Sequence, residues 1–163
     1  GNDNAVAIAD HIAGSTEKFA EMMNAEAKKL MATNSHFVNP SGLHDDNHYT
    51  TAYDLYLIFN ECIKHDDFVK IINSSSYTAH ITGADGTKRD VKWEPTNYYA
   101  KGEATPPDNV TIIGGKTGTT KGAGNCLILL TKDSSGNPYI SIIMGAGSKP
   151  LLYQDMTSML SKI

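Results

Sequence analysis

The 163-residue sequence predicts an α+β domain, with helices first, antiparallel strands next and one closing helix. Two observations carry this prediction. Up to residue 72, apolar side chains recur every three or four positions, which is the period of an amphipathic helix. From Ser76 onwards, apolar and polar residues alternate in short runs separated by clusters of turn residues, which is typical of antiparallel strands.

Four helices are expected in the first part of the chain. The first ends at Gly14, and Ser15 then caps a second, whose apolar residues form one stripe expected to face a core. After a long loop rich in Asn, Pro, Gly and Asp, Thr51 and Asp54 resemble a capping box that opens the third helix, and 66–72 reads as a short fourth. The stripe of the second helix consists of Phe19, Met22, Met23, Ala27, Leu30 and Met31.

Five strands and a closing helix are expected in the second part. The strands cover 76–82, 87–93, 109–120, 125–132 and 138–147. The first two flank the turn "GADG" and form a hairpin, and the last two are joined by the turn cluster "DSSGN". The closing helix is expected to dock on the sheet rather than on a membrane, because few basic residues flank its apolar face. That face consists of Leu152, Met156, Met159, Leu160 and Ile163.

The composition excludes several classes of protein. A formal net charge of −4 and a pI near 5.8 argue against a nucleic-acid surface, and no apolar run approaches the ~20 residues that span a bilayer. The two cysteines, Cys62 and Cys126, lie in apolar runs and are expected to be buried free thiols. The run from His44 to His48, "HDDNH", lies in a loop without the helical pitch that would aim both rings at one metal, so no metal site is expected.

The stretch "GGKTGTT", 114–120, is the part of the sequence most suggestive of chemistry. Its Gly-Lys-Thr matches the end of a phosphate-binding loop, but such a loop needs an earlier glycine where Val110 stands. The residues after the motif lead to another strand, so no helix N-terminus points at an anion. The pattern therefore excludes a nucleotide site.

As a strand, the same stretch presents Lys116 and Thr117 to opposite faces of a sheet, so both can touch one ligand only if it lies along a free edge. The glycines within 114–118 would let another backbone or a substrate approach closely. An ammonium and a hydroxyl suit a substrate carboxylate, and a free edge leaves the N–H of Thr119 available as an oxyanion donor. The tripeptide by itself leaves two alternatives open, namely a substrate site and a glycine-softened hairpin strand with an exposed lysine.

The wider sequence bears on that choice. The stretch "HFVNPSGLHDDNHYTTAYDL", followed by "GGKTGTTKGAGNCLILLTK", strongly resembles the D-alanyl-D-alanine carboxypeptidases, which are low-molecular-mass penicillin-binding proteins. The likeness runs from residue 1 to residue 163. It implies a serine-type enzyme that trims the D-Ala-D-Ala end of peptidoglycan stem peptides through an acyl-enzyme, that β-lactams inhibit, and that acts in the cell envelope, outside the cytoplasmic membrane. It implies no metal and no cofactor.

The family carries three motifs, Ser-x-x-Lys, Ser-x-Asn and Lys-Thr-Gly. By resemblance, Lys116 of the third motif and Asn2, which matches the asparagine of the second, are the catalytic residues. Thr117, Gly118 and Thr119 bind the substrate: the Thr117 hydroxyl holds the terminal carboxylate, and the Thr119 N–H completes the oxyanion hole. Lys116 supplies positive charge and links to the second motif.

Two stretches match the missing motifs only in letters. Ser15 to Lys18, "STEK", is a helix cap with a surface lysine, and Ser135 to Asn137, "SGN", is a turn between two strands. The resemblance therefore implies that 1–163 is a partial catalytic domain without its N-terminal strands and its Ser-x-x-Lys helix, inactive alone because the nucleophile is absent. The sheet edge exposed beside Lys116 predicts marginal stability, self-association or binding of an N-terminal fragment.

Two other functions stay open on the sequence. One is a non-catalytic homologue that only binds wall peptides. The other is a serine β-lactamase, which shares the three motifs but normally needs a deacylating glutamate; neither Glu61 nor Glu94 has a context that suggests this role.

Overall fold

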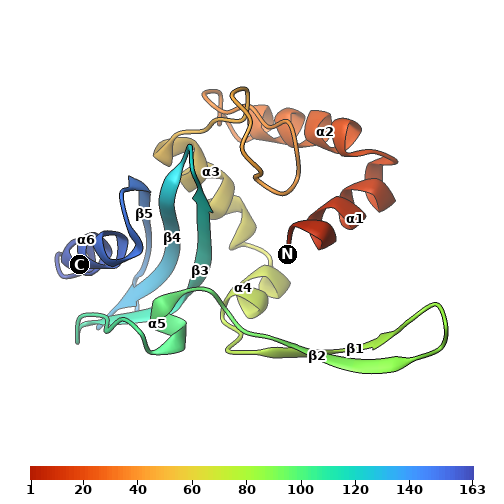
Figure 1. The fold of residues 1–163 in the computed structure, drawn as a ribbon. Helices are drawn as coiled ribbons and strands as arrows, with labels where there is room; N and C mark the ends of the chain where they lie inside the picture. Colours follow the sequence, from red (N-terminus) through yellow and green to blue (C-terminus); the bar gives the residue numbers. More distant parts are fainter.

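A three-stranded antiparallel sheet, in the order β3-β4-β5, forms the centre of the molecule. The computed structural model describes all 163 residues and confirms the predicted α+β architecture. Helix α6 covers one face of the sheet, while α3 lies on the other and α4 lies beside β3 (Figure 1). The bounds of these elements are Ala52–Cys62 for α3, Asp66–Ile72 for α4, Val110–Thr120 for β3, Gly124–Asp133 for β4, Pro138–Ala146 for β5 and Lys149–Leu160 for α6.

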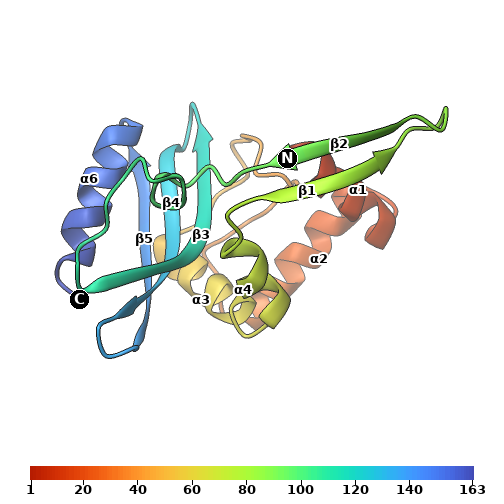
Figure 2. The same cartoon turned by 90° about the horizontal axis from the view of Figure 1, so that it is seen from below.

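The remaining elements extend from this centre. The helix pair α1 and α2 packs mainly on itself, and the hairpin of β1 and β2 projects from the body as a long arm (Figures 1 and 2). A single turn of helix, α5, follows the hairpin and was not predicted. The bounds are Asn2–Ala13 for α1, Thr16–Lys29 for α2, Tyr77–Thr82 for β1, Lys88–Trp93 for β2 and Tyr98–Lys101 for α5. No helix has the length and apolar character needed to cross a membrane.

The helix boundaries follow the predicted capping residues. Gly14 ends α1 in the left-handed conformation, with φ 82°. The Ser15 hydroxyl accepts a hydrogen bond from the Lys18 N–H at 3.2 Å and begins α2, and the Thr51 hydroxyl accepts one from the Asp54 N–H at 3.1 Å and begins α3. The Asp54 carboxylate does not complete a capping box. It is buried and instead accepts hydrogen bonds from the Asn34 N–H and the Ser35 hydroxyl, both in the loop before α3.

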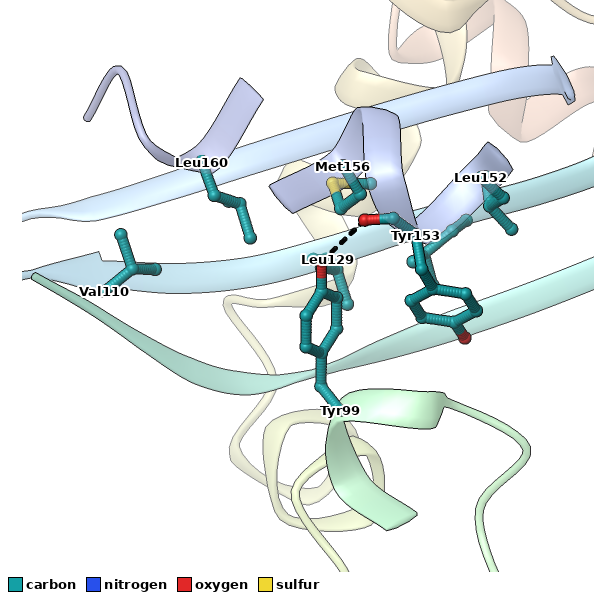
Figure 3. Close-up of a cluster of buried hydrophobic side chains, with 8 residues drawn as sticks. Tyr99, Val110, Leu129, Leu152, Tyr153, Met156 and Leu160 are labelled. Atoms are coloured by element: carbon teal, nitrogen blue, oxygen red, sulfur yellow. Dashed lines mark hydrogen bonds between the residues drawn. The ribbon is translucent and has the colours of Figure 1, made fainter. Parts of the chain in front are cut away.

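The hydrophobic core lies between α6 and the sheet. Its fully buried members include Leu127 and Leu129, which project from the same face of β4. Figure 3 shows Leu129 with Met156 of α6, which is also fully buried. The Tyr99 hydroxyl bonds to the Thr157 hydroxyl at 2.7 Å, which ties α5 to α6. The predicted apolar face of the closing helix is confirmed: Leu152, Met156 and Leu160 are buried, and Met159 and Ile163 pack against them.

The predicted apolar stripe of the second helix, α2, is only partly buried, and Ala27 is its one fully buried member. In α2 the residues that become buried are Ala20 and Ala27, while Met22 stays 50% exposed and Met31, beyond the helix end, 71% exposed. Helical periodicity identifies an apolar face but not whether another element covers it, and little of this chain packs on the α1–α2 pair. Both cysteines are free as predicted, but Cys62 and Cys126 are half-buried rather than buried.

Candidate active site

A cleft of about 490 Å³ runs along the free edge of β3. It brings together all five residues that the sequence had singled out, although Asn2 lies far from the other four in sequence. Those residues are Asn2, Lys116, Thr117, Gly118 and Thr119. The other walls come from the loop 41–43, from Thr96 and from Lys149 at the start of α6.

The edge position of β3 explains why one cleft reaches both faces of the strand. β4 pairs with β3 on one side only, from Val110 opposite Asp133 to Thr120 opposite Gly124. Lys116 and Thr117 point to opposite faces because strand side chains alternate, yet both line the cleft. The prediction that 110–118 forms an edge strand is confirmed, and alternate N–H groups on its outer side have no strand partner.

The glycines of the motif have different structural roles. A Cβ at Gly114 would stand 2.1 Å from the carbonyl oxygen of Ile72, so this glycine allows the end of α4 to reach β3. A Cβ at Gly118 would have no neighbour closer than 4.0 Å, the Cβ of Cys126. The close approach of the α4 backbone to β3 therefore requires a glycine at 114. At 118 no neighbouring atom requires a glycine, and the absence of a side chain leaves the cleft open.

We expect Gly114→Ala to destabilise the protein by about 1–3 kcal/mol, because the added methyl group meets backbone that cannot rotate away. Gly118→Ala is the matched control, with a change of less than about 0.5 kcal/mol. Urea unfolding followed by circular dichroism measures both. Equal stability of the two variants would contradict the close contact between α4 and β3.

The cleft is positively charged. Two lysines, Lys116 and Lys149, line it, and none of its fifteen lining residues is acidic. Crowding by the cleft walls removes water from the ammonium group and lowers the pKa of Lys116, although the side chain as a whole stays exposed. The Lys116 ammonium donates a hydrogen bond to the carbonyl oxygen of Thr117 and none to Asn2. The arrangement favours an anionic ligand that can replace this contact.

Hydroxyl groups accompany these charges. The Thr117 and Thr96 Oγ1 atoms lie 2.5 Å apart, which is a short hydrogen bond. The Thr119 hydroxyl donates to the Asn125 side chain at 3.3 Å, and Asn125 in turn donates to the carbonyl oxygen of Ala146 at 3.1 Å. The cleft end of all three strands is thereby held in register.

A tight turn at 39–43 contributes part of the cleft wall. The Asn39 carboxamide oxygen accepts hydrogen bonds from the N–H groups of Gly42 and Leu43, at 2.8 and 3.1 Å. Gly42 has φ 76°, the left-handed conformation that favours glycine. The sequence predicted a long loop here, but nothing local indicated that 41–43 would line the site.

The two motif lookalikes have the roles predicted for them. Ser15 caps α2, and Ser135 lies in the β4–β5 turn, where its N–H donates to Asp133 Oδ1 at 2.9 Å. Neither lines the cleft. Glu61 pairs with Lys64 at 2.6 Å and Glu94 with Lys92 at 2.8 Å, both outside the cleft, so neither is placed to activate a water there.

The two histidines of the predicted "HDDNH" stretch lie in different surroundings. His48 Nδ1 accepts a hydrogen bond from the Val38 N–H at 3.2 Å, and burial lowers the pKa of His48. His44 lies 3.6 Å from the Asp46 carboxylate at the surface. The two rings thus have different partners and do not converge on one point.

Sequence comparison places these features in a known family. A family model described as D-alanyl-D-alanine carboxypeptidase matches residues 1–148. The chain is 31% identical over 165 residues to D-alanyl-D-alanine carboxypeptidase DacF of Bacillus subtilis, covering 98% of this chain and 38% of that protein. It is 33% identical over 150 residues to DacD of Escherichia coli, covering 91% of this chain and 34% of that protein.

Solved structures share the fold. The Streptomyces K15 DD-transpeptidase superposes with a TM-score of 0.86 at 28% identity, over 98% of this chain and 61% of that one. DacD from Francisella tularensis gives 0.81 at 24% identity, over 99% of this chain and 48% of that one, a likeness of fold. The chain thus spans 34–38% of the two curated relatives named above. The match over 1–148 shows that the chain belongs to the D-alanyl-D-alanine carboxypeptidase family, peptidase family S11.

Proposed function

We propose that residues 1–163 form the C-terminal portion of the catalytic domain of a serine-type D-Ala-D-Ala carboxypeptidase. The observation that carries this proposal is the cleft itself, in which two ammonium groups and several hydroxyls, those of Thr96 and Thr117 among them, line an edge strand and no lining side chain is acidic. A peptide that ends in a carboxylate fits this arrangement, because it can pair with the strand edge and place its charge beside Thr117 and the lysines.

In the proposed reaction, the Thr117 hydroxyl and the Lys116 ammonium hold the substrate carboxylate, and the Thr119 N–H stabilises the negative charge that develops on the scissile carbonyl oxygen. Asn2 contacts the peptide from the start of α1. A serine oxygen supplied by residues outside 1–163 attacks the carbonyl carbon, and its proton passes through a base to the amine of the departing D-alanine. Water then adds to the ester and releases the shortened peptide.

The same site would accept a β-lactam, whose carboxylate and strained amide carbonyl match these groups. We place the enzyme in the cell envelope, outside the cytoplasmic membrane, where stem peptides of peptidoglycan are exposed.

The test uses the full-length protein. Incubation with benzylpenicillin is expected to add one antibiotic mass to the intact protein, and a peptide ending in D-Ala-D-Ala is expected to release D-alanine. Residues 1–163 alone are expected to do neither. Absence of both signals from the full-length protein would leave the non-catalytic wall-peptide-binding homologue, and steady antibiotic turnover would establish the β-lactamase instead.

The lowered pKa of Lys116 predicts a pH dependence of binding. Only the protonated Lys116 ammonium attracts a substrate carboxylate. The affinity for a peptide that ends in a carboxylate is therefore full below the lowered pKa of Lys116. It falls as the pH rises through that pKa, before the ordinary lysine value of 10.5 is reached. A bound carboxylate raises the pKa again, so binding in this window takes up a proton. Calorimetry in two buffers of different ionisation enthalpy measures the uptake, and Lys116→Arg, which keeps its charge, should abolish it.

We further propose that a free edge of the sheet mediates self-association or binds an N-terminal fragment. The sequence analysis expected this contact at the edge beside Lys116, but that edge lines the cleft, so we assign the contact to the opposite edge, β5. β5 pairs only with β4, and its residues Tyr139 and Met144 are 39% and 38% exposed. Met144→Lys is expected to abolish concentration-dependent sedimentation of residues 1–163. Gln154→Lys, on the exposed side of α6, is the control of equal charge, and identical behaviour of both variants would exclude pairing through β5.

A further inference from the structure

Thr96 is the one side chain that bonds to the Thr117 hydroxyl, and the proposed reaction gives it no role. The two Oγ1 atoms lie 2.5 Å apart across 21 residues of sequence, and both residues line the cleft. We infer that Thr96 is a positioning residue, which holds the Thr117 hydroxyl in the orientation that donates to a substrate carboxylate. This inference rests on the proposed function of the cleft.

The direction of the bond follows from the chemistry of the ligand. A carboxylate only accepts hydrogen bonds, so the Thr117 hydroxyl must donate its single proton to the ligand. The Thr117 oxygen can then only accept from Thr96, and the Thr96 proton is the one between them. A hydroxyl that accepts one bond while donating another is polarised and donates more strongly.

The surroundings of Thr96 make it a fixed support. Asn97, which follows it, is 4% exposed, and its side-chain oxygen caps α5 by accepting from the Tyr99 N–H at 3.1 Å. The Tyr98 N–H donates to the Tyr153 hydroxyl at 2.9 Å, and the two rings stack with centroids 4.5 Å apart and planes 8° from parallel. The segment is thereby anchored to α6 and to the core.

Thr117 lacks comparable restraint of its own. It lies on an edge strand, where its side chain has no neighbouring strand beyond it, and the bond to Thr96 is the only hydrogen bond that its hydroxyl makes. Without Thr96, the hydroxyl could rotate among staggered orientations, of which only some point into the cleft. Thr96 therefore connects the rigid α6 core to the carboxylate-binding group.

The test compares two substrates in the full-length protein, a peptide ending in the D-Ala-D-Ala carboxylate and the same peptide with a C-terminal amide. Thr96→Val removes the hydroxyl at nearly constant shape and is expected to lower kcat/KM for the carboxylate peptide about three- to tenfold. The amide peptide should change less than about twofold. Thr96→Ser, which keeps the hydroxyl, should restore the wild-type preference for the carboxylate.

Three further variants make the outcome unambiguous. Thr111→Val replaces an exposed threonine at the far end of the same strand, outside the cleft, and should leave both rates unchanged. Thr117→Val should remove the preference, and the double variant should be no worse than Thr117→Val alone. If Thr117→Val removes the preference while Thr96→Val keeps it, or lowers both rates equally, the positioning role is overturned and the proposed function stands. If Thr117→Val has no effect, the proposed carboxylate site itself is wrong, and the inference with it.

Discussion

Lys116→Met in the full-length protein is expected to slow acylation by benzylpenicillin by about 10²–10⁴-fold. The substitution removes the positive charge of the residue that precedes Thr117 and keeps a side chain of similar size. No acidic residue lines the cleft, so Lys116 has no carboxylate partner there to lose. The substitution therefore removes only the attraction of its charge for the anionic ligand and for the developing oxyanion. Stopped-flow mixing with a chromogenic cephalosporin measures the rate.

The control for this substitution is Lys132→Met, which removes an equal charge from an exposed position on β4 outside the cleft. It should acylate at the wild-type rate. Lys116→Arg should be intermediate, since it keeps the positive charge but not the shape of the ammonium group. Wild-type acylation by Lys116→Met would show that the cleft works without this lysine and would remove the central residue of the proposed site.

The second large effect concerns stability. Leu129→Ala is expected to lower the free energy of unfolding by about 2–5 kcal/mol. Leu129 is 0% exposed on the central strand β4 and packs against α6. Because small domains are stable by only about 5–15 kcal/mol, this loss would unfold much of the population if the chain is as marginal as its free edges predict.

Urea unfolding with near-ultraviolet circular dichroism measures this effect. Leu151→Ala is the control on the neighbouring helix, where the side chain is 49% exposed, and should change stability by less than about 0.5 kcal/mol. Leu129→Met, which conserves volume, should cost less than about 1.5 kcal/mol. A small effect of Leu129→Ala would mean that the α6 face is not the principal core.

Much of this protein follows from local sequence. The spacing of apolar residues distinguishes the helical part of the chain from the part that forms strands. Ser15 and Thr51 begin helices because their hydroxyls accept hydrogen bonds from backbone N–H groups. The glycine-rich run at 114–118 indicates an edge strand. These features depend on neighbours within a few residues, so a linear reading detects them. Lys116 and Asn2, by contrast, were assigned catalytic roles by resemblance to the motifs of the D-alanyl-D-alanine carboxypeptidases.

The tertiary structure decided what no local pattern encodes. Thr96, Lys149 and the loop 41–43 line the cleft because distant elements meet there, and the bond between Thr96 and Thr117 spans two segments with no shared motif. The exposure of Met22 in α2, the half-burial of the cysteines and the diversion of Asp54 from its predicted cap were likewise unpredictable. Burial and side-chain partnership depend on which surfaces pack together, and packing is a property of the folded chain.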